Sequence, residues 1–545
     1  MKTVTTLLPT FVLSALLFFI STLAIAAVPA SFVYTSGQQF MMDGNPYYFQ
    51  GNNIYYASIV DGATTDQNIV DMMYNASQKG VKVMRIWGFS DGVWGGTTPI
   101  QSAIGVWNGQ SNIVALKKLD YAISQAQLRG MKVILPLVNS WKEYGGMVWY
   151  VHQILGASHT KVEFFTNAAC QAAYKNYVNM ILNRTNYYTN VTYKNDPTIL
   201  SWELANEPNS YDEQLPNYGD NWDPSGTKIK AWLTIMADYV HFLDPNHMIS
   251  TGEEGYKTGG SDWTDNGSKS LDFAGNTAIG NISFATIHVY PDAWSKSPAQ
   301  INAFMADRAS IAHALGKPII LEEFGSKAIG SMPTPGNKYD RDSILTEFIN
   351  TARYNNFAGA MVWQMADIIR DVDFDFLFSS STGTVIRNNA VYMNSKKYDF
   401  ENSVNGWTKV PSVGGLYSTT EWAYLGGYSL KAYFALSTGA KLSLKNAVVD
   451  NYTGKTKVQA VVKNAPWGNQ GAGMTAKLYI KAGPFYAWHD GGSIAINSNS
   501  AGTTLTLNLS GIEYLDQIRE IGVEYSAGTS SSGQTSVYVD NITVQ

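Results

Sequence analysis

The stretch Ile199-Leu-Ser-Trp-Glu-Leu-Ala-Asn-Glu-Pro208 is a short apolar run that ends in an amide, a carboxylate and a proline. Alternation along a β-strand predicts two faces. One face carries Leu200, Trp202 and Leu204 against helices, and the other carries Ser201, Glu203, Ala205 and Glu207. The stretch Pro318-Ile-Ile-Leu-Glu-Glu-Phe-Gly325 has the same character. Buried strands with acids at their carboxyl ends are typical of a parallel barrel with its active site at that rim.

The alternation of apolar strand, loop and amphipathic helix continues on both sides of these stretches. Predicted strands are 47–52, 81–87, 132–137, 199–206, 248–251, 283–290, 318–323 and 359–364, and predicted helices include 66–79, 114–129, 168–182, 228–242, 299–315 and 341–354. Eight strands alternating with helices predict an α/β fold, a (β/α)₈ TIM barrel over residues 27–389. No Gly-x-Gly-x-x-Gly follows the first strand, which disfavours a dinucleotide-binding fold.

The sequence pattern changes after about residue 389. Residues 398–545 show short alternations of Val, Leu, Ile, Tyr and Thr separated by Gly, Asn and Ser, with almost no helical periodicity. This pattern predicts a second domain, a β-sandwich of jelly-roll type. The junction at 388–397 has no Ser/Thr/Pro-rich spacer, so we expect the two domains to be packed together or semi-rigidly joined.

The first 26 residues have the pattern of a secretory signal peptide. Lys2 is the positive end, 11–23 is the apolar region, and Ala-Ile-Ala at 24–26 is the cleavage site. The alternative is a membrane anchor, since the apolar run approaches the length of a bilayer span. Polar residues and Pro9 interrupt it, so we expect cleavage, an extracellular location and no membrane association afterwards.

Composition narrows the classes of ligand. Charged residues are only 15% of the 545 residues, aromatic residues are 13%, and the formal net charge is −5. Without a basic field, nucleic acid is excluded as a partner, and the many aromatic rings suit neutral, flat ligands such as sugars. The single cysteine, Cys170, allows no intrachain disulfide. No His/Cys cluster is present, so we expect no cofactor for catalysis.

Glu207 and Glu323 end two strands that lie across the predicted barrel from each other. Hydrolysis of a glycosidic bond needs such a pair, because one carboxyl group protonates the leaving oxygen while the other attacks the anomeric carbon. The alternative is that both are ordinary charges on the rim.

These motifs resemble glycoside hydrolase family 5. The resemblance rests on Asn206-Glu207-Pro208 and Glu323-Phe324-Gly325, and it extends over about residues 33–375. The runs Arg85-Ile-Trp-Gly-Phe-Ser-Asp-Gly92 and Ser250-Thr-Gly-Glu-Glu-Gly-Tyr256 resemble its endo-β-1,4-mannanase subfamily.

The resemblance implies that Glu207 is the general acid/base and Glu323 the nucleophile of a retaining enzyme. Glu322 is set aside because the family nucleophile directly precedes Phe-Gly. Arg85 matches an arginine that stabilises the nucleophile, and its alternative role is a structural partner for Glu203; both roles are compatible.

The same resemblance implies further substrate-binding residues. Asn206 would bind the 2-hydroxyl of the reacting sugar, His288 and Tyr290 would orient the nucleophile and line the site, Trp363 would stack under the sugar, and Trp87 and Glu254 would lie in the cleft. Sugar platforms are also expected among Trp87, Trp94, Trp107, Trp141, Trp149 and Trp294.

The second domain resembles jelly-roll carbohydrate-binding modules through its first and last strands, Tyr398-Asp-Phe-Glu401 and 537–542. The resemblance implies a structural Ca²⁺ held by Asp399, Glu401 and Asp540, since hard oxygen ligands suit that ion. The alternative is that these acids are edge-strand charges. Candidate glycan contacts are Trp422, Trp467, Tyr486 and Trp488.

The function expected from the sequence is a secreted, monomeric, retaining endo-β-1,4-mannanase that cleaves internal bonds of mannan, glucomannan or galactomannan. Two alternatives remain: a β-1,4-glucanase on the same barrel, and a non-catalytic glycan-binding protein. The intact pair Glu207 and Glu323 disfavours the second, because a lectin needs neither.

Overall fold

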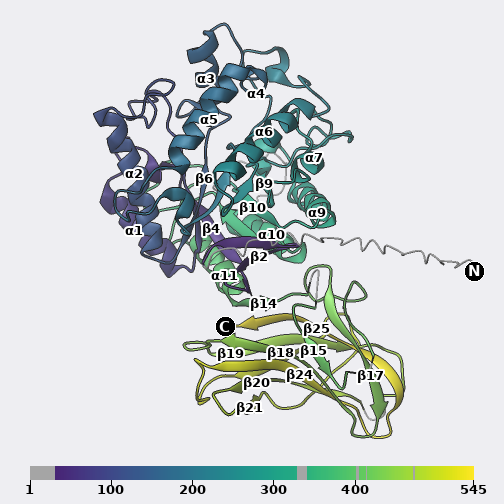
Figure 1. Cartoon of the computed structure of the whole chain (residues 1–545). Helices are drawn as coiled ribbons and strands as arrows, with labels where there is room; N and C mark the ends of the chain where they lie inside the picture. Colours follow the sequence, from purple (N-terminus) through teal and green to yellow (C-terminus); the bar gives the residue numbers. More distant parts are fainter. Residues whose placement is uncertain (1–30, 328–339, 401–403, 413, 471–472) are drawn as a thin grey trace, which may run out of the picture.

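The computed structural model describes residues 31–327, 340–400, 404–412, 414–470 and 473–545, which form two domains (Figure 1). The signal peptide predicted at 1–26 lies outside the described residues and stays a prediction.

The first domain is the predicted barrel. Its eight strands are β4 (Phe49–Asn53), β5 (Val83–Arg85), β6 (Lys132–Pro136), β7 (Ile199–Glu203), β8 (Met248–Ser250), β9 (Ala285–Val289), β10 (Ile319–Phe324) and β11 (Gly359–Val362). All pair in parallel, in the order β8-β7-β6-β5-β4-β11-β10-β9. The backbone N–H of Ser283 donates to the Ile249 oxygen at 2.8 Å, which joins the ends of this order into a closed barrel.

Helices surround the barrel (Figure 1). They are α1 (Asp66–Gln78), α2 (Gln110–Gln127), α3 (Gly146–Leu155), α4 (Glu163–Thr166), α5 (Ala168–Leu182), α6 (Thr227–Leu243), α7 (Phe273–Thr277), α8 (Pro291–Trp294), α9 (Pro298–Ala314), α10 (Arg341–Tyr354) and α11 (Ser381–Ser395). The six predicted helices are all present, and the start of α1 is fixed by a capping box between Thr65 and Asn68.

The junction predicted at 388–397 is not a linker. Residues up to Ser395 belong to α11, and the next strand, β14 (Lys396–Tyr398), begins at once. The segment contains many weak helix formers, and its helical state is stabilised by packing of Ile386, Ala390 and Met393, which are buried at helical spacing.

One strand departs from simple alternation. Leu200 lies in the apolar cluster inside the barrel, with Val83 and Ile134, and does not face the helices as predicted. The register between β6 and β7 shifts at this point, where Ile199 pairs with Val133 but Ser201 pairs with Ile134. Because of this extra residue, the Leu200 side chain points into the barrel, whereas the Trp202 side chain still packs outward against the helices.

A short antiparallel unit closes the amino-terminal end of the barrel. It consists of β1 (Val33–Ser36), β2 (Gln39–Met42) and β3 (Asn45–Pro46). Val33 and Phe40 of this unit are buried in the cluster inside the barrel together with the first residues of the barrel strands. The barrel is therefore accessible to a ligand from its carboxyl-terminal end.

The second domain is the predicted β-sandwich of two antiparallel sheets. One sheet contains β16 (Leu416–Thr419), β17 (Ser429–Ser437), β25 (Ser532–Val544), β19 (Lys457–Asn464) and β23 (Thr503–Asn508), with β14 paired to β25. The other contains β15 (Thr408–Val410), β18 (Lys441–Asp450), β24 (Ile518–Ser526), β20 (Thr475–Ala482) and β21 (Ala487–Asp490), with β22 (Ile494–Ala495) paired to β20. Apolar residues of both sheets share one core.

The sandwich contacts the amino-terminal end of the barrel (Figure 1). Asp399 accepts hydrogen bonds from Gln39 at 2.6 Å and from the Tyr48 hydroxyl at 2.5 Å, and both donors belong to the barrel domain. Lys397 also reaches Asn45 at 3.0 Å. The prediction that the domains are packed together is confirmed, and the sandwich lies opposite the open end of the barrel.

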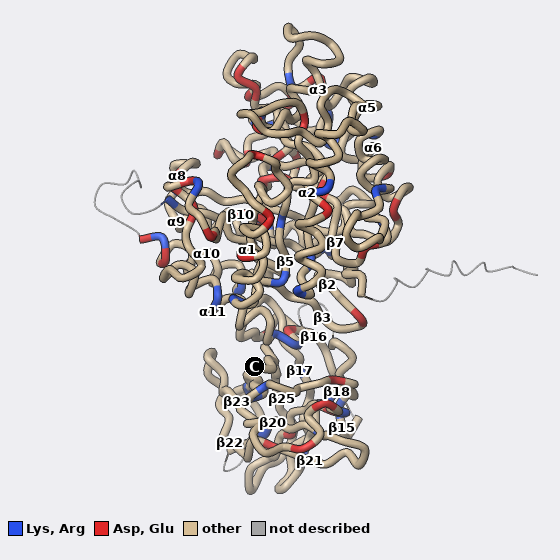
Figure 2. Tube along the Cα trace, turned by 90° about the vertical axis from the view of Figure 1, so that its left-hand side faces the viewer, with Lys and Arg blue, Asp and Glu red and all other residues tan. Residues whose placement is uncertain are grey.

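Charged residues of both signs are scattered over the two domains (Figure 2). Cys170 is buried in α5 and unpaired. Within the described ranges, no helix is both long and apolar enough to span a membrane.

Candidate active site

A cleft of about 640 Å³ opens at the carboxyl ends of the barrel strands. Of the residues predicted to bind or act on substrate, seven line it: Trp87, Asn206, Glu207, Glu254, Tyr290, Glu323 and Trp363. The remaining two, Arg85 and His288, are buried and contact the two glutamates directly.

Glu207 follows β7 in a loop that is held from two sides. Its backbone N–H donates to the Gly252 oxygen at 2.8 Å, and the preceding Asn206 forms a parallel bridge with Asn139. Its φ of 50° lies in the left-handed region. Such a conformation costs a residue other than glycine about 1–3 kcal/mol and is concentrated at functional sites. This loop geometry, and not strand alternation, turns the Glu207 carboxyl group into the cleft.

A bulge in β10 turns two consecutive acids toward the interior. Leu321 pairs with Ile287 of β9, but the next pair joins Glu323 with His288, so Glu322 is an extra residue. Without the bulge, alternation would point only one of the two acids inward. With it, Glu323 reaches the cleft and Glu322 lies fully buried beneath it.

Arg85 is the cation at the centre of the barrel. Its Nε and Nη2 donate to the two oxygens of Glu203 at 2.9 and 2.6 Å, and its Nη1 donates to Oε1 of Glu323. It also donates to Asn53 at 3.2 Å and to Asn206 at 2.7 Å. Both roles considered for Arg85, partner of the nucleophile candidate and partner of Glu203, are therefore met by one side chain.

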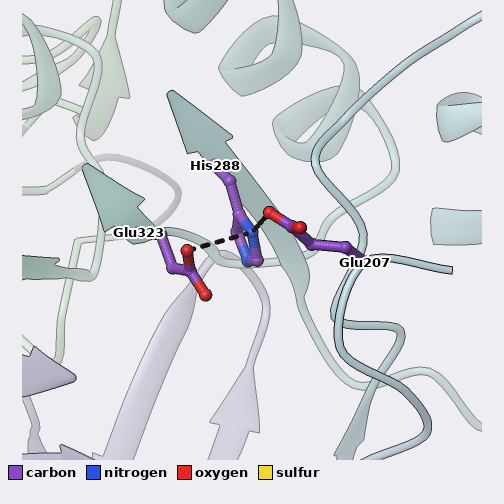
Figure 3. A group of neighbouring side chains, drawn as sticks. All are labelled: Glu207, His288 and Glu323. Atoms are coloured by element: carbon purple, nitrogen blue, oxygen red, sulfur yellow. Dashed lines mark hydrogen bonds and ion pairs between the residues drawn. The ribbon is translucent and has the colours of Figure 1, made fainter. Parts of the chain in front are cut away.

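His288 lies between the two glutamates of the cleft (Figure 3). Its Nδ1 is 2.7 Å from Oε1 of Glu207 and 3.7 Å from Oε2 of Glu323. One oxygen or nitrogen atom from each of Glu207, His288 and Glu323 lies within 4.8 Å of the other two. In the described part of the chain, these three side chains are therefore close enough together to be tested as a metal site. However, the Glu323 oxygens already bind Arg85 and Tyr290, and the guanidinium charge opposes a second cation, so the set does not fit a metal.

The electrostatics distinguish the two glutamates. Burial raises the pKa of both carboxyl groups above their usual value. Arg85 forms an ion pair with Glu323, while among the described residues no Lys or Arg side chain forms an ion pair with Glu207, whose neighbour is the His288 ring. Burial also lowers the pKa of His288 to about 4, so the imidazole is neutral near pH 7. The negative charge is therefore favoured on Glu323 and the proton on Glu207.

The other predicted residues complete the cleft. The Tyr290 hydroxyl donates to Oε2 of Glu323 at 2.5 Å. Asn206 is held by Arg85 and donates to Asn139 at 2.9 Å. Glu254 accepts from the Tyr256 hydroxyl at 2.5 Å and from Asn209 at 3.1 Å. Burial raises the pKa of Glu254 well above its usual value, so it enters the cleft as a hydrogen-bonding acid.

Several cleft residues were not singled out from the sequence. The Tyr55 ring stacks on Trp363, with centroids 5.5 Å apart and planes 6° apart. Trp141, expected only as a sugar platform, donates its indole N–H to Oε2 of Glu207. Lys161, which lines the adjoining cavity, has its ammonium 5.6 Å from the centre of this indole ring and is buried, and burial lowers its pKa to about 7. No local sequence signal marks these residues, because loops bring them together from distant segments.

The six tryptophans proposed as sugar platforms separate into three groups. Trp87, Trp141 and Trp294 line the cleft. Trp94 and Trp149 line a cavity of about 600 Å³ that shares Trp141, Glu143 and Tyr211 with the cleft. Trp107 instead packs against Tyr177 of α5.

The predicted calcium ligands of the sandwich have other partners. Asp399 pairs with the Lys396 ammonium at 2.9 Å, in addition to its contacts with the barrel. Asp540 is buried and accepts the backbone N–H groups of Tyr424 and Leu425 at 2.7 and 3.0 Å. Glu401 lies outside the described residues, so the three-ligand site stays a prediction.

The four aromatic candidates of the sandwich differ in exposure. Trp422 is buried and donates to the Ser500 oxygen at 2.9 Å, which makes it part of the core. Trp467, Tyr486 and Trp488 are exposed. Trp488 lies flat on Tyr479 with ring centroids 3.8 Å apart, and its indole N–H donates to Asp490 at 2.7 Å.

A (β/α)₈ barrel with two facing glutamates at the carboxyl ends of its strands is the arrangement expected of a glycoside hydrolase. Comparison with protein families gives the same class. Residues 30–384 match the model described as GH family 5 beta-mannosidase-like, and residues 398–541 match the one described as mannanase, galactose-binding domain-like. The chain therefore belongs to glycoside hydrolase family 5.

Relatives with assigned names support this membership. The chain is 32% identical over 401 residues to mannan endo-1,4-β-mannosidase 7 of Arabidopsis thaliana, covering 68% of this chain and 86% of that protein. It is 35% identical over 315 residues to mannan endo-1,4-β-mannosidase A of Aspergillus aculeatus, covering 55% and 75%.

Solved structures show the same fold. The endo-1,4-β-mannanase from Rhizomucor miehei matches with a TM-score of 0.60 and 31% identity, covering 67% of this chain and 99% of that one. The endo-β-1,4-mannanase from Thermotoga petrophila matches with a TM-score of 0.56 and 24% identity over 88% and 97%, so its similarity in fold extends beyond the barrel.

Proposed function

We propose that this glycoside hydrolase is a retaining endo-β-1,4-mannanase that cleaves internal bonds of mannan-type polysaccharides. The observation that carries the proposal is the spacing of the two carboxyl groups, whose ligand oxygens lie within 4.8 Å of each other and of the His288 ring. Retaining glycosidases hold their carboxyl groups about 5–5.5 Å apart, whereas inverting enzymes need roughly 6.5–9.5 Å for an intervening water. The names of the relatives favour mannan over glucan as the substrate.

In the proposed mechanism, Glu323 attacks the anomeric carbon and forms a covalent glycosyl-enzyme. Arg85 and Tyr290 stabilise its carboxylate and hold it in position for attack. Glu207 gives its proton to the leaving oxygen and then, as a base, activates water for the second displacement. Asn206 is placed to bind a hydroxyl of the reacting sugar, and Trp363 offers an apolar surface to its C–H face.

Hydrolysis of mannohexaose tests the proposal. Glu207→Gln and Glu323→Gln should each reduce turnover by at least about 10³-fold, because each removes proton transfer or covalent catalysis. Glu213→Gln, an exposed acid near the cleft, is the matched control. Proton NMR should show the β-anomer as the first product, and an initial α-anomer contradicts retention. Faster cleavage of carboxymethylcellulose than of mannan would favour the glucanase alternative.

The chain is further proposed to be secreted after cleavage near residue 26 and to act as a monomer. The order of Lys2, apolar run and small residues supports secretion. Amino-terminal sequencing of the protein from culture medium and light scattering test these two points.

The sandwich is proposed to bind the polysaccharide through Trp488, whose ring is 39% exposed although it stacks on Tyr479. A flat, immobilised ring suits the apolar face of a pyranose. In full-length chains carrying Glu323→Gln, Trp488→Ala should reduce the fraction bound to insoluble mannan. Tyr354→Ala removes an exposed ring from α10 and is the control. Equal binding by both variants would exclude Trp488 as the contact.

A further inference from the structure

Glu322, the buried acid beside the proposed nucleophile, has no role in the mechanism above. Its Oε2 lies 3.3 Å from Nε2 of His288. Its Oε1 meets no N–H or hydroxyl donor among the described residues. The carboxyl group of Glu203 is the neighbouring acid that acts on Glu322 most strongly. Both oxygens of Glu203 already accept hydrogen bonds from Arg85.

The surrounding charges determine the protonation state of Glu322. Arg85 contacts the carboxylates of Glu203 and Glu323, and it does so without touching Glu322. Two ionised carboxylates in contact away from water repel each other strongly, so one of them takes up a proton. Because Glu203 is the one paired with the guanidinium, Glu322 carries the proton and donates it from Oε1 to Glu203. Burial and the Glu203 charge accordingly raise the pKa of Glu322 well above its usual value.

This arrangement selects one tautomer of His288. A neutral imidazole carries a single N–H. Since the Glu322 proton is on Oε1, Oε2 is a carbonyl oxygen that can only accept, and it takes the Nε2–H of His288. Nδ1 is then without a proton, and its partner at 2.7 Å is Oε1 of Glu207. The proton in that hydrogen bond must therefore belong to Glu207.

We propose that Glu322 is a positioning residue: by accepting the Nε2–H of His288, it leaves Nδ1 as the acceptor that keeps the acid proton on Glu207. The proposal rests on the proposed function, in which Glu207 is the acid. Without Glu322, the imidazole can carry its hydrogen on Nδ1 and donate to an ionised Glu207, which cannot protonate a leaving oxygen. The charged and titratable groups that act on the ring are Arg85, Glu203, Glu207, Glu322 and Glu323.

Two substitutions separate the tautomer role from mere packing. Glu322→Met fills a similar volume without hydrogen bonds, and turnover of mannohexaose should fall by about 10–100-fold, part of the 10²–10⁴ that a positioned acid supplies. The alkaline limb of its kcat profile should move to lower pH, because an Nδ1–H donor stabilises ionised Glu207. Glu322→Gln can accept from Nε2–H with its carbonyl oxygen and donate to Glu203, so it should recover at least about tenfold of that loss.

Infrared difference spectra supply a readout independent of activity. Near pH 7, the spectrum of the intact chain minus that of Glu322→Gln should contain the C=O band of a protonated carboxyl group. Leu321→Met, on the opposite face of β10, is the packing control and should leave the pH profile in place.

Three results would overturn the inference: an absent C=O band, equal losses in Glu322→Gln and Glu322→Met, or a Glu322→Met profile that keeps its alkaline limb. The infrared result does not depend on substrate. If the intact chain fails to cleave mannohexaose, the proposed function fails even where the band is present.

Discussion

Replacing Arg85 by Met tests the electrostatic centre of the barrel. The guanidinium is 1% exposed, donates five hydrogen bonds and is the cation that contacts Glu203 and Glu323. Removing one partner of a buried ion pair costs about 3–5 kcal/mol, because the other charge stays buried without compensation. Two carboxylates share this one cation, so their losses do not simply add. We therefore expect the free energy of unfolding to fall by about 3–5 kcal/mol at pH 8.

The loss should depend on pH in a defined direction. In Arg85→Met, the carboxyl group of Glu323 has lost the charge that lowered its pKa, so the folded state holds this proton more tightly than the unfolded state. Stability from such groups is complete below the unfolded pKa and is lost as pH rises through the folded pKa. The deficit relative to the unsubstituted chain should therefore shrink as the pH falls from 8 toward 5.

Activity should report the same change. Arg85 lowers the pKa of Glu323 against the larger effect of burial, and Glu323 must be ionised to attack. Without Arg85, the acid limb of the kcat profile should move to higher pH by about two units, the shift that roughly 3 kcal/mol implies at 1.36 kcal/mol per unit. Urea unfolding at pH 5 and 8 and kcat profiles on soluble mannan measure both effects.

Arg184→Met is the matched control for this experiment. Arg184 forms an ion pair with the buried Asp120, which lies in α2 on the outside of the barrel and does not line the cleft. Its removal should reduce stability and leave the acid limb in place. A deficit in Arg85→Met that is equal at pH 5 and 8, together with an unmoved acid limb, would refute the electrostatic reasoning.

Three further substitutions address other parts of the site. Trp141→Phe removes the donor that lowers the pKa of Glu207, so the alkaline limb of kcat should move to higher pH; an unmoved limb contradicts this role. Gly252→Ala would place a Cβ 2.0 Å from the Ala205 oxygen at a φ of 71°, and thermal unfolding should show a loss of at least about 2 kcal/mol. Trp363→Ala should lower kcat/KM on mannohexaose at least about tenfold, from roughly 1.4 kcal/mol of lost stacking; full activity would show that no sugar contacts the ring.

Much of the fold could be predicted because it depends on local patterns. All eight barrel strands and six helices were located from apolar periodicity, since burial of one face requires that spacing at every position. The helix α11 was missed because its propensity is weak, and it forms through packing against the barrel and α10. The sequence pattern predicted the sandwich fold of the second domain. It did not predict that Asp399, which the resemblance assigns to a calcium site, would bind Gln39 and Tyr48 of the barrel domain.

The sequence by itself determined the barrel, the sandwich and the identity of the two candidate glutamates, because periodicity and short motifs are local properties of the chain. Only the tertiary structure decided which way those glutamates point. Alternation cannot foresee the bulge that turns both Glu322 and Glu323 inward, or the left-handed turn that aims Glu207 at His288. Protonation is also a tertiary property, because it depends on how many buried carboxyl groups share one guanidinium, and Arg85 is brought to them from β5 by the closure of the barrel.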